Sequence, residues 1–159
     1  MSDATPVSLA LAEMGIPHRE FRHPGPVRSL EQAAKERGQT PGQVVRSIVF
    51  RIGKGEFVMV LVAGPSQISW PDLRAHLNQS RLTMASNEEV LSATGYLPGA
   101  VSPFGLPAPL RILTDKDVFV PEEISIGSGV RGIAIIMKSS DLRKALGDVE
   151  IDRFGPIRS

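Results

Sequence analysis

The sequence predicts an α+β domain with a curved, mixed and largely antiparallel sheet, barrel-like in form and flanked by helices. Helix start and stop signals recur along the chain, and runs of β-branched residues stand between them. These runs outnumber the strands that strict alternation of strand and helix would give, which argues against a doubly wound parallel sheet. With 159 residues, 42% of them hydrophobic, the chain has the size and apolar content of a single domain, 1–159.

The helix signals are local and frequent. Most predicted helices start at a Ser or Thr that can cap the first turn, and a Gly ends four of them. Ser86 and Glu89 form one capping box, and Ser29 and Gln32 form another. The predicted helices are 7–14, 30–37, a single turn from Thr40 to about Val45, 70–77, a helix from Ser86 to Gly95, and 140–146.

The strand signals begin with a hairpin. Residues 47–52 and 57–63 are β-branched and aromatic runs separated by a turn that contains Gly53 and Gly55. Because 57–63 is apolar at nearly every position, both faces of this strand should be covered. Further strands are expected at 82–84, 110–113, 123–126 and 132–137, whereas the tail 148–159 has no clear period.

Composition excludes several classes of function. The 18 basic and 17 acidic residues leave a net charge of +1, which argues against binding nucleic acid by bulk charge but allows a local basic patch. The absence of Cys excludes disulfides and thiolate chemistry, and the three His residues are not spaced as ligand pairs, so no metal or cofactor is expected. No apolar run approaches the ~20 residues that span a bilayer, and no secretion signal is visible. We therefore expect a cytoplasmic protein without a membrane partner.

Two glycine-rich segments are candidates for binding chemistry. Residues 95–105 contain three Gly and two Pro, and such a loop can present main-chain N–H groups to a carbonyl or phosphate oxygen. Residues 127–132 lie between two predicted strands, where Arg131 could hold a phosphate or carboxylate. A rigid crossover loop and a plain hairpin with a solvated Arg131 are the alternative interpretations. Arg46, at the mouth of a strand, could enter a pocket or pair with a surface carboxylate.

Taken together and in order, several segments resemble the YbaK-like aminoacyl-tRNA deacylases, a family that also includes the editing insertion of bacterial prolyl-tRNA synthetases. The resemblance covers about residues 5–147. It rests on the helix with Ser-Leu-Glu-Gln-Ala-Ala, on Gln43-Val-Val-Arg-Ser-Ile-Val-Phe50, on the GxxxP loop at Gly99–Pro103 with its flanks, and on Gly127-Ser-Gly-Val-Arg-Gly132.

The resemblance implies hydrolysis of the ester that joins a wrong amino acid to a tRNA, commonly a proline tRNA, without a metal or a covalent enzyme intermediate. It assigns a catalytic role to Arg46 and to the backbone amide of Gly99. The substrate-binding residues that it implies are Phe21, His23, Ser47, Ala100, Val101, Ser102, Pro103, Gly127, Ser128, Gly129 and Arg131.

Two positions depart from the family pattern. Arg46 stands where members typically carry a lysine, and the exchange replaces a compact ammonium with a planar guanidinium. Ala134 stands where some members carry an acidic residue, so the pocket should be more apolar.

Three functions remain open from the sequence. The first is a trans-editing hydrolase of mischarged tRNA, with a synthetase as a possible partner. The second is a non-catalytic module that binds tRNA ends, aminoacyl adenylates or a synthetase. The third is a general esterase, which the lack of a nucleophile–base pair disfavours. Candidate tRNA contacts are Arg19, Arg22, Arg28 and Lys54, although each also fits a solubilising charge.

Overall fold

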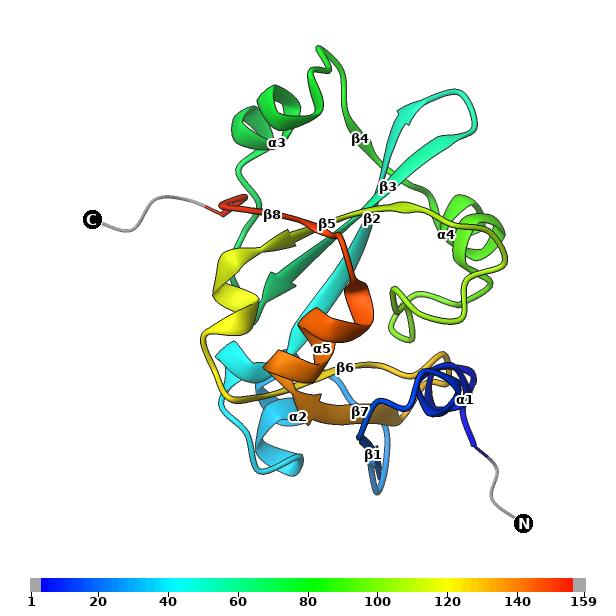
Figure 1. Cartoon of the computed structure of the whole chain (residues 1–159), viewed down its shortest axis with the longest axis vertical. Helices are drawn as coiled ribbons and strands as arrows, with labels where there is room; N and C mark the ends of the chain where they lie inside the picture. The colour runs from blue at the N-terminus through cyan, green and yellow to red at the C-terminus, as the bar shows by residue number, and fades with distance from the viewer. Residues whose placement is uncertain (1–3, 156–159) are drawn as a thin grey trace.

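The computed structural model describes residues 4–155, and Figure 1 shows helices packed around two sheets. The helices are α1 (Pro6–Glu13), α2 (Leu30–Glu36), α3 (Trp70–Leu77), α4 (Asn87–Thr94) and α5 (Ser139–Leu146), with 3₁₀ turns at Pro41–Gln43 and Lys116–Phe119. The strands are β1 (Arg19–Arg22), β2 (Val45–Gly53), β3 (Glu56–Ala63), β4 (Thr83–Met84), β5 (Arg111–Asp115), β6 (Glu123–Gly127), β7 (Ile133–Lys138) and β8 (Glu150–Asp152). The predicted α+β class is confirmed.

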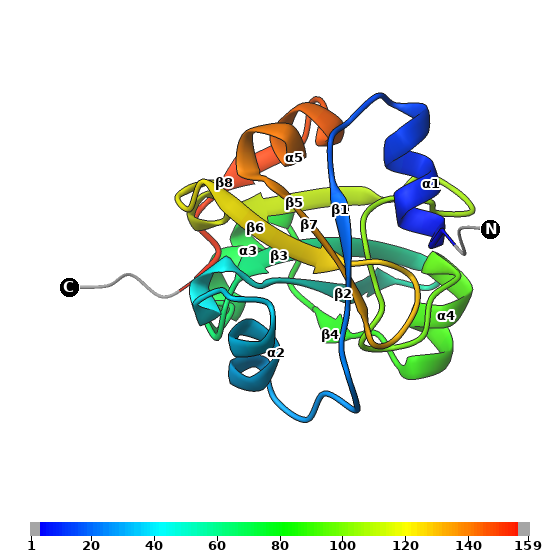
Figure 2. The same ribbon diagram turned by 90° about the horizontal axis from the view of Figure 1, so that it is seen from below.

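The strands form a three-stranded sheet, in the order β1-β7-β6, and a five-stranded sheet, in the order β4-β2-β3-β5-β8. Figure 2 shows the smaller sheet crossing in front of the larger one. Pairing is antiparallel except where β5 joins β3 and β8 in parallel, so the sheets are mixed and largely antiparallel as predicted. The predicted hairpin is the β2–β3 pair, which is the longest ladder of the fold.

The barrel-like form predicted from the sequence is not confirmed, because the strands of residues 4–155 form two separate sheets rather than one closed sheet. The two sheets meet at a single parallel bridge between Val44 and Ser125, at the start of β2. The next residues of β2, from Val45 to Ile48, line a cavity instead of extending this bridge into a ladder. The cavity therefore lies where a barrel would close.

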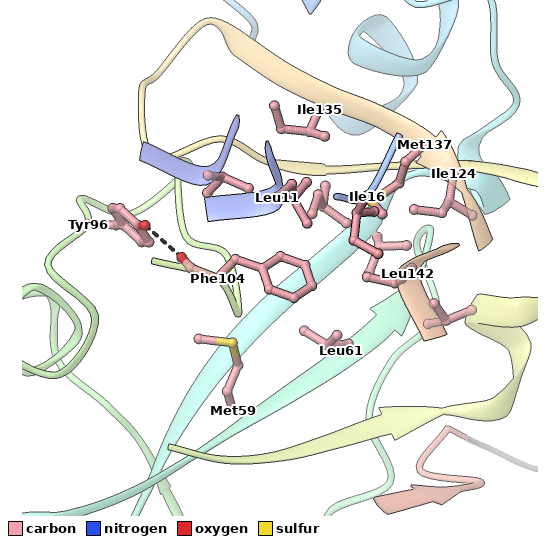
Figure 3. Packing of buried hydrophobic residues seen from close by; sticks show 14 of the residues in the cluster. Leu11, Ile16, Met59, Leu61, Tyr96, Phe104, Ile124, Ile135, Met137 and Leu142 are labelled. Carbon is pink, nitrogen blue, oxygen red and sulfur yellow. Dashed lines mark hydrogen bonds between the residues drawn. The ribbon is translucent and has the colours of Figure 1, made fainter. Parts of the chain in front are cut away.

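The main core fills the space between the two sheets. Figure 3 shows Ile124, Ile135 and Met137 on one side facing Met59 and Leu61 on the other. Leu11 of α1 and Leu142 of α5 complete this core, and both are fully buried. At about 25 cal/mol per Å² of buried apolar surface, such side chains each contribute roughly 1.5–3 kcal/mol.

A second core lies on the other face of the five-stranded sheet, under α3. Phe50 and Val60 pack there against Leu73 of α3 and against Phe154. Because β3 contributes to both cores, it is apolar on both faces, as its sequence predicted.

The tail contains a strand that its sequence did not indicate. Strand β8 pairs in parallel with β5, and the carboxylate of Asp115 accepts hydrogen bonds from the backbone N–H groups of Phe154 and Gly155 at 2.8 and 3.0 Å. Three residues are too few to show a period, so the contacts of Asp115 and Phe154 decide the position of this segment. Strand β1 and the turn at Lys116–Phe119 were not among the elements predicted above.

Candidate functional site

A cavity of about 890 Å³ opens at the junction of the two sheets. Five parts of the chain enclose it: the segment between β1 and α2, the end of α2, the start of β2, the loop 95–105 and the end of β6 with the turn that follows. Its lining residues are His23, Gly25, Pro26, Val27, Arg37, Val44, Val45, Arg46, Ser47, Ile48, Pro98, Gly99, Val101, Ile126, Gly127, Arg131, Gly132 and Ile133. This volume lies within the range of small-molecule sites.

The two glycine-rich segments singled out in the sequence pack against each other at this cavity. The N–H of Gly129 donates to the carbonyl of Ala100 at 2.9 Å, and Arg131 Nε donates to the carbonyl of Pro98 at 2.9 Å. A Cβ on Gly127 would lie 2.2 Å from the carbonyl oxygen of Val101, so only glycine permits this approach. Segments about 30 residues apart in sequence thus form one wall.

Gly99 lines the cavity and has a backbone N–H without a partner in the described part of the chain. It is exposed and has a φ of +90°, a conformation that glycine adopts readily and other residues do not. No group of residues 4–155 accepts a hydrogen bond from the N–H of Gly99 or from that of Val101. Such N–H groups are suited to an oxyanion or a phosphate oxygen.

Tyr96 holds this loop in shape. Its hydroxyl donates to the carbonyl of Phe104 at 2.6 Å (Figure 3) and lies 3.2 Å from the carbonyl of Gly105. Burial raises the pKa of Tyr96, which keeps the hydroxyl protonated as the donor.

Arg46 lines the cavity, but its guanidinium is bound to the backbone of the loop after β3. Arg46 Nε donates to the carbonyl of Gly64 at 2.7 Å, and Nη2 donates to the carbonyl of Ser66. Burial lowers the pKa of Arg46, although not enough to remove its charge. A lysine could not make this two-pronged contact in the same way, because its ammonium is a single point of donation.

Ser47 contributes a buried hydroxyl that has no partner. Its Oγ is inaccessible and makes no hydrogen bond in the part of the chain that the structure describes, yet the residue lines the cavity. Because strand residues alternate faces, Ser47 lies on the face of Val45 and Val49, between the two sheets, and Arg46 on the opposite face. A buried hydroxyl without a partner is destabilising by about 1–3 kcal/mol, so a ligand group that bonded it would recover that loss.

The side chain of His23 is buried and hydrogen-bonded to both Glu36 and Arg37. Its side chain is 1% exposed, and Nδ1 lies 2.6 Å from Oε1 of Glu36. Arg37 Nε donates to His23 Nε2 at 3.1 Å. Because Arg37 can only donate, Nε2 is the acceptor and Nδ1 carries the hydrogen that is shared with Glu36. Both ring nitrogens are occupied, so His23 has no lone pair left for a substrate or a water.

Six of the expected site residues lie outside the lining of the cavity and support it instead. Ser128 Oγ, for example, bonds the carbonyls of Val130 and Ile133 and braces the turn, and the ring of Phe21 packs edge-on against His23. The six are Phe21, Ala100, Ser102, Pro103, Ser128 and Gly129, whereas His23, Arg46, Ser47, Gly99, Val101, Gly127 and Arg131 line the cavity.

Sequence reasoning missed Arg37, which it placed only as the last residue of a helix. Arg37 Nη1 donates to Ser125 Oγ at 2.8 Å, across 88 positions of sequence. No local signal could reveal this, because the partners of Arg37 come from β6 and from the segment after β1. The contribution of Pro26 and Val27 to the lining was also missed.

Other chemistry-bearing groups lie away from the cavity. Ser8 Oγ and His18 Nε2 form a nucleophile–base pair at 2.7 Å, contrary to the prediction that none exists, but neither residue lines the cavity. Within residues 4–155, the His, Asp and Glu side chains form no group of three that could hold a metal ion. No helix there has the length and apolar character needed to cross a bilayer.

The fold and the cavity define a class: a small α+β domain whose cavity is lined by residues with unused backbone N–H groups and by arginine side chains. The chain belongs to the aminoacyl-tRNA editing domain family, whose model matches residues 24–145. The family resemblance found in the sequence is therefore confirmed.

The similar proteins are of two kinds. The chain is 39% identical over 92 residues to a proline–tRNA ligase of Kosmotoga olearia, a match that covers 58% of this chain and 16% of the ligase. It is 27% identical over 135 residues to the multifunctional Ser/Thr-tRNA deacylase ProXp-y of Escherichia coli, covering 82% of this chain and 80% of the deacylase. The chain thus spans about a sixth of the ligases that it matches and most of the deacylase.

A solved structure supports the fold over almost the whole chain. The crystal structure of a proposed trans-editing enzyme for prolyl-tRNA synthetase superposes with a TM-score of 0.86 at 26% identity, covering 95% of each chain.

Proposed function

We propose that this protein hydrolyses the ester bond of mischarged aminoacyl-tRNA as a free-standing editing enzyme. A proline tRNA carrying a small wrong amino acid is the proposed substrate. The observation that carries the proposal is the cavity in which the unused N–H of Gly99, the unpartnered hydroxyl of Ser47 and the guanidinium-bearing Arg46 all take part. The matching family and the deacylase relative support it.

The reaction needs little from side chains. Water adds to the ester carbonyl carbon, the bond to the ribose oxygen breaks, and the products are the free amino acid and a tRNA with a free hydroxyl. In this proposal the N–H of Gly99 donates to the oxygen that becomes negative, and removing one such donor typically lowers kcat about 10²–10³-fold. His23 acts by holding Arg37 and not as a base, since both its ring nitrogens are bonded.

The proposal also covers the extent of the domain, the compartment in which it works and its contacts with the tRNA. Residues 1–159 act as one editing domain, and the enzyme works in the cytoplasm on tRNA, with a synthetase as a possible partner. Arg19, Arg22, Arg28 and Lys54 are proposed contacts to the tRNA, and none of them lines the cavity. Each such contact should weaken with added salt, because a bound phosphate releases counterions.

Release of amino acid from a panel of mischarged tRNAs tests the proposal directly. The panel should include proline tRNA charged with alanine, serine, threonine and cysteine, because one methylene changes discrimination by only about 1–3 kcal/mol. Release from at least one tRNA, above the rate without protein, is expected. No release from any member at high protein concentration would refute the proposal.

Two variants of Arg46 separate its charge from its contacts. Arg46→Ala removes both the cation and the bonds to Gly64 and Ser66, and it should abolish release. Arg46→Lys keeps the charge and should retain or raise release. Thermal unfolding of both variants shows whether a lost activity reflects a lost fold.

A second function is favoured by one observation: the bonds of Arg46 to two carbonyls leave it fewer donors for a substrate. The chain would then be a non-catalytic module that binds aminoacylated ends. It would bind a stable aminoacyl-adenosine analogue but release no amino acid. Release that depends on Arg46 contradicts this alternative.

A further inference from the structure

The charged side chains that line the cavity are all arginines. Arg37, Arg46 and Arg131 line it, and among the residues that the structure describes no Asp or Glu does. The acyl end of an aminoacyl ester offers these side chains little, because its carboxyl group is esterified and its α-amine is largely cationic near neutral pH. The oxygen that becomes negative during hydrolysis can engage one cation. Further arginines indicate a second anion, and the nucleotide end of the substrate supplies one as a phosphodiester.

Arg37 is a half-buried arginine that no carboxylate of residues 4–155 contacts directly, although the burial that lowers its pKa is partly offset by the charge of Glu36, which lies behind His23. Its hydrogen-bond partners are two neutral groups, His23 Nε2 at 3.1 Å and Ser125 Oγ at 2.8 Å. It makes no ion pair with any carboxylate in the part of the chain that the structure describes, and its Nη2 makes no hydrogen bond there. Burial lowers the pKa of Arg37 by removing water from the cation, and a bound anion would offset that loss of hydration.

Each partner of Arg37 is itself held by a further group, so the guanidinium has a fixed orientation. On one side Glu36 accepts from His23 Nδ1 at 2.6 Å, which leaves Nε2 as the acceptor for Arg37. On the other side Ser125 Oγ donates to Gln39 Oε1 at 2.8 Å, which leaves its lone pairs for Arg37. Because these contacts already hold the side chain in one rotamer, it loses less conformational entropy when it binds a ligand.

The other two arginines are placed differently. Arg46 donates through Nε and Nη2 to the carbonyls of Gly64 and Ser66. Arg131 is exposed and bonds Pro98 at the wall of the cavity. Arg37 differs from both because its two acceptors are side chains, and further side chains, Glu36 and Gln39, hold them in place.

We infer that Arg37 binds the phosphate that adjoins the terminal nucleoside of the substrate, with His23–Glu36 and Ser125–Gln39 as its positioning residues. The inference rests on the proposed function for the identity of the ligand. It predicts that the cavity distinguishes a nucleotide from a nucleoside, a distinction that does not depend on the amino acid.

Equilibrium binding of 5′-AMP and of adenosine to the full chain tests the inference without any turnover. The wild-type protein should bind 5′-AMP more tightly than adenosine. Arg37→Met should lose about 10- to 100-fold of the affinity for 5′-AMP, the loss typical of one charged hydrogen-bonded contact, and leave the affinity for adenosine unchanged. Arg74→Met, on α3 and outside the cavity, is the matched control and should change neither affinity.

A second variant guards against misfolding. Arg37→Gln removes the charge but keeps an amide donor for Ser125 or His23, and it should show the same selective loss. Equal losses of 5′-AMP and adenosine affinity in both variants would assign Arg37 a structural role only and overturn the inference, as would no loss at all. Inorganic phosphate should bind more weakly than 5′-AMP, and equally tight binding would overturn the assignment to a nucleotide.

The outcomes separate this inference from the proposed function. A chain that binds 5′-AMP through Arg37 but hydrolyses no mischarged tRNA refutes the deacylase and keeps the phosphate site. A chain that hydrolyses mischarged tRNA while Arg37→Met retains the preference for 5′-AMP refutes the phosphate site alone.

Discussion

Replacing Gly99 by alanine tests whether the backbone at this position is part of the reaction. A Cβ at Gly99 would have only Arg131 Nε nearby, at 3.9 Å, so alanine fits the space. The φ of +90° is the difficulty, because an L residue in this region is strained by about 1–2 kcal/mol. The loop cannot relax as a whole, since the carbonyl of Ala100 accepts from Gly129. The strain therefore rotates the peptide that carries the Gly99 N–H.

The expected result is a fall of about 5- to 30-fold in the rate of amino acid release, since each 1.4 kcal/mol corresponds to about tenfold. Single-turnover release from a mischarged proline tRNA, with protein in excess, measures this rate without contributions from product dissociation. Gly25→Ala is the matched control. Gly25 lines the same cavity, has no positive φ and would have no other atom within 4 Å of an added Cβ. A wild-type rate in Gly99→Ala, or equal losses in both variants, would refute the role of this amide.

Three further substitutions test other features of the structure. Gly127→Ala places a Cβ 2.2 Å from the carbonyl oxygen of Val101 and should force the two glycine-rich segments apart. The free energy of unfolding, measured by urea denaturation, should fall by about 1–3 kcal/mol. Unchanged stability would contradict the contact. Ser47→Ala should leave the free energy of unfolding unchanged or raise it, because the Oγ of Ser47 has no partner. Binding of an aminoacyl-adenosine analogue, measured by calorimetry, should weaken about 2- to 12-fold. Equal affinity would exclude Ser47 from the site. Hydrogen bonds from Arg111 lower the pKa of Glu150 to about 2 from 4.5, so this pair stabilises the fold above pH 4.5 and loses its effect as the pH falls towards 2. With Glu150 37% exposed, solvent limits the effect to about 1 kcal/mol. Arg111→Met should lose that much at pH 7 and progressively less as the pH falls through 2, whereas a pH-independent difference would refute this account.

The local elements could be predicted because their causes are local. Ser86 and Glu89 form the reciprocal cap that their spacing predicts, at 2.9 and 3.2 Å, and the helix over Trp70–Leu77 has the predicted bounds. Strand β8 could not be predicted in this way, because its place depends on Asp115, whose carboxylate holds the backbone of Phe154 from 39 positions away. The open sheets could not be predicted either, since nothing in the sequence of β2 shows that its first residues face a cavity.

The sequence by itself determined most of the helices and strands, the family and the two glycine-rich segments beside the cavity, because capping, periodicity and glycine content act over a few residues. Only the tertiary structure decided which side chains line the cavity. It bound Arg46 to the loop after β3, occupied both ring nitrogens of His23 and brought Arg37 into the cavity through Ser125. Hydrogen-bond partners that lie 13 to 88 positions apart set the direction of these side chains, and such contacts exist only once the chain has folded.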